Sequence, residues 1–289
     1  MMPRLSHTNA TWFFVVLHLI ALVFGLIGML IMLPNPDLWA SDPNAVRIFD
    51  LSMKYAGAVH IWLGAIALFL YGWSSIGLRK TAIFAAIAYP LSLTSELLGT
   101  GTGWPFGNYA YTDFLGPKAL DHVPWSIPAS WFYMGFASYL LGCAIVDRLG
   151  GSRSWLVPCL AGAWLLTAWD LVLDPAMAHE SLRITFWVWD ESGPYFGMPI
   201  KNFIGWTVTA FLFMALSRLA WRAPAQLRGS LLVPLVVFIA NMIFAIVISA
   251  SVDLWVPIIA AVLVGIAPLL LIQRERFRIA ATKRDPLRA

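Results

Sequence analysis

Long runs of apolar residues, separated by short polar segments, dominate the chain from residue 12 to residue 272. A bilayer core about 30 Å thick needs about 20 apolar residues to be crossed by a helix. Eight segments meet this requirement and predict eight transmembrane helices near residues 12–33, 55–73, 82–98, 128–146, 155–173, 202–219, 231–249 and 255–272. No small-residue cleavage site follows the first segment, so we expect it to be a retained span, not a signal peptide.

The basic residues divide unevenly between the two ends of these predicted helices. Eight crossings put both chain termini on one side, and 14 of the 19 Lys and Arg residues lie there. The other five are Arg47, Lys54, Lys118, Arg183 and Lys201. The positive-inside rule then predicts that both termini are cytoplasmic. We expect one all-α membrane domain over 1–289, with a helix bundle at 12–272 and a basic cytoplasmic tail at 273–289, in the cell membrane.

The composition supports a membrane protein and argues against several other classes. Hydrophobic residues make up 60% of the chain and charged residues 12%, against about 45–50% and about 25% in soluble proteins. A net charge of only +4 argues against nucleic-acid binding. Cys143 and Cys159 provide no disulfide framework. Five scattered histidines are too few for a membrane di-iron hydroxylase.

Several cofactor-binding classes lack the residues that they need. No lysine lies inside a predicted span, where a retinal Schiff base would form. The glycines at 99–107 follow no predicted strand and precede no Lys-Ser/Thr pair, so they do not indicate a phosphate-binding loop. No dinucleotide fingerprint is present, and the spacing of Asp170 and Asp174 gives at best half of a prenyl-transferase motif. We expect no metal and no organic cofactor.

Acidic residues and tryptophans gather on the side opposite the termini. The two long connections, residues 99–127 and 174–201, also lie on that side. Both are rich in Trp, Tyr, Phe, Pro and Gly, which favour packed loops over disordered ones. We therefore expect two structured outer loops that cap the bundle. They share Phe-Gly turns at 106–107 and 196–197, explained by an internal duplication or, more simply, by convergent use of turn residues.

Three carboxyl groups are expected within the membrane next to these loops. Glu96 lies near the end of the third predicted helix, while Asp170 and Asp174 share one face of the fifth. Ionisable residues inside a span are costly and point to function. A partly desolvated carboxyl group can stay protonated near neutral pH, as a general acid must. The structural alternatives are a turn stabilised by Asp174 and an ion pair of Glu96 with Lys118 or Arg183.

Other polar and small residues in the spans have simpler explanations. His60 and Asn241 fall inside predicted helices, where an interhelical hydrogen bond is a more common role than a site. Glycines such as Gly57, Gly64, Gly135 and Gly162 could open a groove for an apolar ligand. Close packing between helices is the more common role of such glycines, and we expect it here.

Two blocks of sequence carry a resemblance to a known family. The first has ELLGTGTGWPFGNYAY at 96–111 and VPWSIPASW at 123–131. The second has WDLVLDPAM at 169–177, WVW at 187–189 and YFGMPIKNFIGW at 195–206. Over roughly residues 55–250 the chain resembles the membrane carotenoid biosynthesis proteins of the CruF type, which are carotenoid 1,2-hydratases (also numbered 1′,2′).

The resemblance implies an enzyme that adds water across the terminal double bond of an acyclic carotenoid end. Such a hydro-lyase needs no cofactor, and its partners are an acyclic or monocyclic carotenoid, water, membrane lipid and other carotenoid-pathway enzymes. Glu96, Asp170 and Asp174 are the expected catalytic residues. The expected substrate-binding residues are Trp104, Phe106, Asn108, Tyr109, Trp131, Trp187, Trp189, Tyr195, Phe196 and Asn202.

The chemistry of this reaction agrees with the residues. Protonation of the terminal alkene at C2 leaves a tertiary cation at C1, which water then captures. Such a site needs two carboxyl groups of different acidity. Asp174 or Asp170 could supply the proton while Glu96 orients and deprotonates the water, and the exchanged roles remain an alternative. Aromatic faces can stabilise the cation by about 2 kcal/mol.

Two other functions remain open at the level of sequence. A carotenoid end-group cyclase or isomerase begins with the same protonation but excludes water, and the Pro-Glu-Glu motif of small membrane cyclases is missing here. A non-catalytic carotenoid or lipid carrier would need no convergent carboxyl groups. Substitution of these groups would leave its binding intact.

Overall fold

The computed structural model describes residues 7–223 and 227–272. Eight helices in this part of the chain are long and apolar enough to cross a membrane, as predicted. They are α1 His7–Ile27, α2 Pro43–Ile76, α3 Leu78–Thr102, α4 Ser126–Arg148, α5 Leu156–Ala178, α6 Ile200–Ala220, α7 Leu232–Ala250 and α8 Trp255–Ala261. Helix α1 continues into a π turn at Gly28–Met32, and α8 into π and 3-10 turns at Val262–Ile266 and Ala267–Leu269. The protein is therefore a multi-pass membrane protein.

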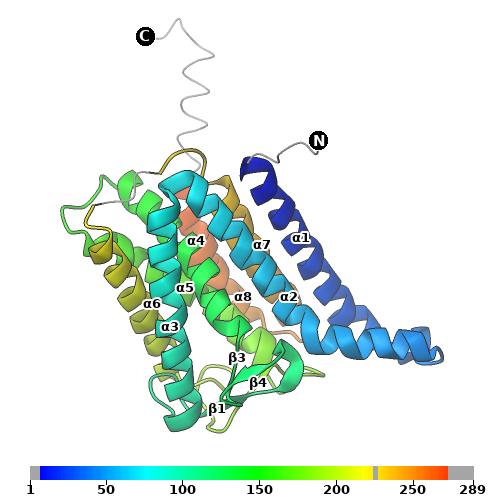
Figure 1. Cartoon of the computed structure of the whole chain (residues 1–289). Coiled ribbons are helices and arrows are strands. Elements are labelled where there is room, and N and C mark those ends of the chain that lie inside the picture. Colours follow the sequence, from blue (N-terminus) through cyan, green and yellow to red (C-terminus); the bar gives the residue numbers. More distant parts are fainter. Residues whose placement is uncertain (1–6, 224–226, 273–289) are drawn as a thin grey trace, which may run out of the picture.

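Helix α4 forms the centre of the bundle (Figure 1). It packs against α2, α3, α5 and α7, and every residue from Ser126 to Gly142 is buried. A helix that is apolar on all sides is stable only where other helices surround it. Because α4 contacts most of the bundle, its side chains can reach sites on several helices at once.

Helix α2 begins well before the predicted start at residue 55. Pro43 occupies its first turn, and the Asp42 carboxylate caps it by accepting a hydrogen bond from the Asn44 backbone N–H at 2.9 Å. Arg47, Asp50 and Lys54 make this segment too polar to be recognised as a span. Figure 1 shows it running outward from the bundle, at the end opposite the start of α1.

Two of the glycines considered as groove formers, Gly135 and Gly162, are packing positions, whereas Gly57 lines the cavity described below. A Cβ atom on Gly135 would lie 2.6 Å from the Phe213 ring, and one on Gly162 would lie 2.8 Å from the Tyr139 backbone. Neither distance leaves room for a side chain or a ligand. These glycines therefore let α4 approach α5 and α6 closely.

The two long loops are structured, and they contain the β-structure of the described chain. Helices α3 and α5 run past the predicted ends, so the loops begin after Thr102 and Ala178. In the first loop lie β1 Tyr109–Tyr111, a 3-10 turn at Asp113–Leu115, β2 Lys118–Ala119 and β3 Val123–Pro124, while the second contains β4 Trp187–Trp189. Strand β2 pairs with β3, and β1 pairs with β4 across the two loops. The β1–β4 pair was not predicted from the sequence.

The predicted cytoplasmic location of the termini stays a prediction. Helix α1 begins and the α8 segment ends at the side opposite β1 and β4 (Figure 1), as an even number of crossings requires. The predicted basic tail at 273–289 and Arg4 lie outside the described residues. The predicted sidedness therefore follows from the distribution of basic residues alone.

Sidedness can be tested with two matched cysteine variants in a background without Cys143 and Cys159. Ser181 is exposed in the second loop and Ser152 is exposed in the α4–α5 connection, at the opposite ends of α5. In intact cells a membrane-impermeant maleimide should label the Ser181→Cys variant. It should label Ser152→Cys only after the membrane is opened. The reverse pattern would place the termini outside.

Candidate active site

The β1–β4 pair brings donors from both loops above the ends of α3 and α5. Tyr109 lies opposite Trp189, and Tyr111 lies opposite Trp187. Alternate residues of a strand face the same side, so Tyr109 and Tyr111 point together, as do the two tryptophans. Each strand therefore presents two aromatic side chains to the bundle.

Glu96, on the last turns of α3, is 3% exposed and accepts hydrogen bonds from three side chains. Tyr109 and Tyr111 donate through their hydroxyl groups to Oε2, the latter at 2.9 Å. The indole Nε1 of Trp131, on α4, donates to Oε1 at 2.8 Å. Burial, and after it the neighbouring Glu96, raises the pKa of both tyrosine hydroxyls well above the usual value, so they remain donors. Both carboxyl oxygens of Glu96 are thus engaged.

The predicted alternative of an ion pair between Glu96 and Lys118 or Arg183 is wrong. Lys118 instead pairs with the Asp113 carboxylate at 2.9 Å, and Glu96 forms no ion pair among the residues that the structure describes. The Glu96 carboxyl group therefore has neutral donors only.

Asp170 and Asp174 lie one turn apart on α5 and share a donor from α6. The side-chain amide of Asn202 donates to Asp170 Oδ2 at 3.0 Å and also to Asp174 Oδ2. Trp187 Nε1 donates to Asp174 Oδ1 at 3.0 Å. The other oxygen of Asp170, Oδ1, is buried with no partner among the described residues. Pro175 lies inside α5, so Asp174 does not stabilise a turn there.

Glu96 and Asp174 face one cavity of about 370 Å³, whereas Asp170 is not among its lining residues. Stacked tryptophans form part of its wall, with the rings of Trp131 and Trp206 4.1 Å apart. The aromatic lining near the carboxyl groups comprises Phe106, Tyr109, Tyr111, Trp131, Trp169, Trp187, Trp189 and Trp206. Two carboxyl groups in an aromatic-walled cavity can exchange protons with an apolar ligand.

Six of the ten predicted substrate-binding residues line this cavity: Phe106, Tyr109, Trp131, Trp187, Trp189 and Asn202. The other four lie outside it. Trp104 is 65% exposed, just after the left-handed Gly103 that ends α3. The Tyr195 hydroxyl donates to the Leu171 carbonyl at 2.9 Å, and Phe196 packs against the Tyr195 ring. These three residues therefore lie outside the candidate substrate site.

Asn108, the fourth residue outside the cavity, joins the two loops. Its side-chain amide donates to Glu191 Oε2 at 3.4 Å, and Glu191 pairs with Lys201 at the start of α6, 2.8 Å away. The hydrogen bond from Lys201 lowers the pKa of Glu191, which keeps it ionised. This contact fixes the end of the second loop against the first.

Three of the eight aromatic residues near the carboxyl groups were not among the predicted catalytic and substrate-binding residues: Tyr111, Trp169 and Trp206. The sequence did contain a signal for two of them. Tyr111 follows Tyr109 by two residues, the repeat of a strand. Trp206 follows Asn202 by four, the repeat of a helix face. Trp169 has no comparable spacing signal.

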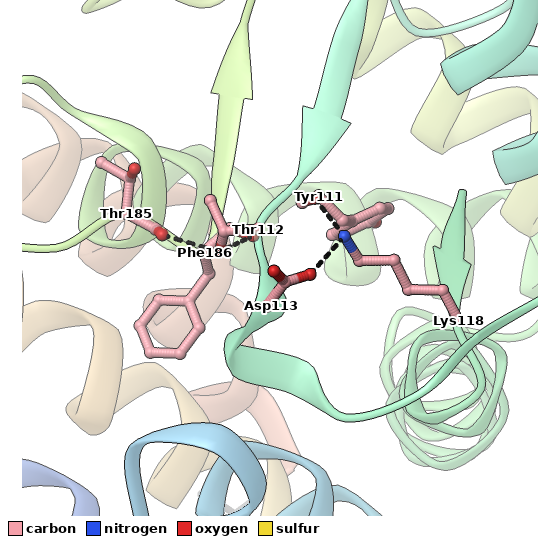
Figure 2. A network of polar contacts seen from close by, with 6 residues as sticks. All are labelled: Tyr111, Thr112, Asp113, Lys118, Thr185 and Phe186. Carbon is pink, nitrogen blue, oxygen red and sulfur yellow. Dashed lines mark hydrogen bonds and ion pairs between the residues drawn. The ribbon is translucent and has the colours of Figure 1, made fainter. Parts of the chain in front are cut away.

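A polar network outside the cavity holds Tyr111 in place (Figure 2). Lys118 Nζ donates to the Tyr111 carbonyl at 2.8 Å while it pairs with Asp113, whose pKa it lowers. The Thr112 hydroxyl group contacts the carbonyl oxygens of Thr185 and Phe186 at 2.9 and 3.0 Å. The backbone that carries Tyr111 is thus attached to both loops.

A second polar network crosses the bundle deeper in the membrane. Asn241 accepts a hydrogen bond from the Tyr133 hydroxyl at 2.9 Å, and its amide lies 3.0 Å from His18 Nε2. His18 Nδ1 contacts the His60 carbonyl at 2.8 Å. The interhelical role expected for Asn241 is confirmed, while His60 takes part through its backbone. The side chains of His60 and Asn241 also line the cavity.

Among residues 7–223 and 227–272, no group of three or more His, Cys, Asp or Glu side chains is arranged to hold a metal ion. The expectation that the reaction needs no cofactor stays a prediction.

Residues 56–268 match the family model described as carotenoid biosynthesis protein. The chain belongs to the carotenoid biosynthesis protein family. A curated relative, the bisanhydrobacterioruberin hydratase of Haloarcula japonica, is 31% identical over 193 residues, which cover 66% of this chain and 60% of the relative. The chain thus spans less than two thirds of that relative. No solved structure matches this chain.

The three donors around Glu96 predict a stability difference between two variants. Glu96→Leu leaves Tyr109, Tyr111 and Trp131 without their acceptor, and an unpaired buried polar group costs about 1–3 kcal/mol. Glu96→Gln keeps one acceptor oxygen. Thermal unfolding in detergent should therefore give a lower Tm for Glu96→Leu than for Glu96→Gln. Equal Tm values would mean that these hydrogen bonds do not support the fold.

Proposed function

We propose that this protein is a carotenoid hydratase that adds water across the terminal C1,C2 double bond of an acyclic carotenoid end. Membership of the family and similarity to a relative named as a hydratase support this activity. The observation that carries the proposal is that Glu96 and Asp174 face one aromatic-walled cavity with different sets of hydrogen-bond donors. Different donors allow one carboxyl group to act as an acid and the other as a base.

Asp174 is the proposed general acid. Asp170 and Asp174 both accept from the Asn202 amide, which places their carboxyl groups close together, and two buried carboxylates so close repel each other unless one of them is protonated. The unpartnered Oδ1 of Asp170 also disfavours charge on this pair. Asp174, unlike Asp170, lines the cavity and can deliver the proton to C2. Asp170 is then a positioning residue that acts through Asn202.

Glu96 is the proposed base. Two hydroxyl groups and one indole N–H stabilise its negative charge and fix its orientation. After C2 receives a proton, water attacks the cation at C1 and Glu96 takes a proton from that water. The product is a tertiary alcohol, heavier by one water. The proton must return to the Asp170–Asp174 pair before the next turnover.

The aromatic wall has two roles in this scheme. Trp and Tyr faces attract the transient cation, by about 2 kcal/mol in a desolvated site. The same rings exclude bulk water, so the cation meets the water molecule that Glu96 orients. In the cell membrane, with cytoplasmic termini, this site would lie in the outer half of the bilayer.

The activity can be tested by co-expression in a bacterial host that makes lycopene or γ-carotene, followed by chromatography with mass detection. A more polar pigment, heavier by one water, is expected. A shift in retention without a mass change would indicate a cyclase or isomerase. Unchanged pigment, with the protein present in the membrane, would favour a carrier.

The two aspartates should differ in their effect on turnover. Asp174→Asn removes the proposed proton donor, and general acids contribute about 10²- to 10⁴-fold, so turnover should fall by at least 100-fold. Asp170→Asn keeps the acid and should lose less. It should also shift the pH profile, because the carboxyl partner of Asp174 is gone. Full activity of Asp174→Asn in a quantitative membrane assay would refute the assignment.

A further inference from the structure

The cavity continues from the carboxyl groups to the far side of the bundle. Its lining includes, besides the residues around the carboxyl groups, His60, the end of α1 and the outward-running first part of α2. At that end it is lined by Phe24, Gly25 and Gly28 on one side, and by Ala45, Ile48 and Phe49 on the other. The cavity is thus longer than the catalytic region requires.

This far end is open. Phe24 is 49% exposed, Ile27 42% and Ile48 63%, although all three line the cavity. At the loop end, by contrast, Phe106 is 1% exposed and Trp187 is 8% exposed. The opening therefore lies between α1 and α2, at the side of the bundle, and not through the two loops.

The opening is apolar. The charged residues on the first part of α2, Arg47, Asp50 and Lys54, are absent from the lining, while Ile48, Phe49 and Met53 belong to it. Trp39 stacks on Phe49, with ring centres 4.0 Å apart. Such a helix, with an apolar face toward the opening and charges away from it, is typical of a membrane interface.

On the α1 side, few side chains cover the opening. No residue of the π turn Gly28–Met32 is buried, and a Cβ atom on Gly28 would meet nothing within 4 Å. Single π turns inside α-helices are frequent at functional sites. Gly28 thus borders the opening with no side chain of its own.

We infer that the carotenoid enters sideways from the lipid, between the end of α1 and the first part of α2, and that only its reacting end occupies the cavity. This inference rests on the proposed hydratase function. The polyene is stiff and about as long as the hydrocarbon core of about 30 Å is thick, so its remainder stays among lipid chains. The protein then selects the end group and not the chain length.

A tryptophan at Gly28 tests this route. The open space around Gly28 allows the fold to accept Gly28→Trp, while the indole fills the opening. A bulky side chain in the space that the carotenoid must pass through is unfavourable for its entry, so carotenoid hydration should fall by at least about 10-fold, whereas Gly28→Ala should stay within about twofold of the unchanged protein. Leu212→Trp, at a 44% exposed position outside the lining, is the matched control and should behave as the unchanged protein.

Carotenoid retained by the purified protein, measured by its absorbance, gives a readout that needs no catalysis. Gly28→Trp should retain less pigment than Leu212→Trp, at the same Tm. If the unchanged protein hydrates nothing, the proposed function fails, but this binding comparison still decides the route. Equal hydration and retention in both tryptophan variants would overturn the inference. So would a strong preference for one length among acyclic carotenoids that share one end group.

Discussion

The pairing of β1 with β4 is the constraint on which the site depends. Tyr111 and Trp187 are directly opposite each other in this pair, and one binds Glu96 while the other binds Asp174. A shift of one residue in the register would turn each side chain to the other face. The networks of Lys118 and Thr112 outside the cavity hold that register. Without the pair, α3 and α5 would present two separate carboxyl groups.

The carboxyl groups of Glu96 and Asp174 have different surroundings, because they accept hydrogen bonds from different donors. Glu96 has three neutral donors to itself, whereas Asp174 shares an amide with a second acid. In water, solvent molecules would weaken the effect of each donor on its carboxyl group. Burial among aromatic rings keeps the effect of each donor strong. In the proposed mechanism the cavity therefore contributes both the contacts to an apolar ligand and the contrast between acid and base. Central α4 links these roles, because Trp131 binds Glu96 and also stacks on Trp206.

Hydropathy was enough to predict the eight helices. The high cost of charge in a membrane was enough to identify Glu96, Asp170 and Asp174 as candidate site residues, and all three are buried. The β1–β4 pair could not be predicted, because one i, i+2 spacing in a three-residue strand does not indicate which segment of a distant loop pairs with it. Asp170 and Asp174 share a helix face, yet only Asp174 reaches the cavity, and this depends on the rotation of α5. Trp104 and Phe106 are two residues apart, but the turn between them exposes one and buries the other.

The depth of the site also affects the product. Glu96 lies six residues before the end of α3, and Asp174 four before the end of α5, which at 1.5 Å per residue places both within about 10 Å of one end of the bundle. In the proposed reaction the new hydroxyl group forms near the lipid headgroups of that face. The alcohol can leave with its polar end already at the interface. A carotenoid with two reactive ends would have to reverse its orientation in the bilayer before the second hydration.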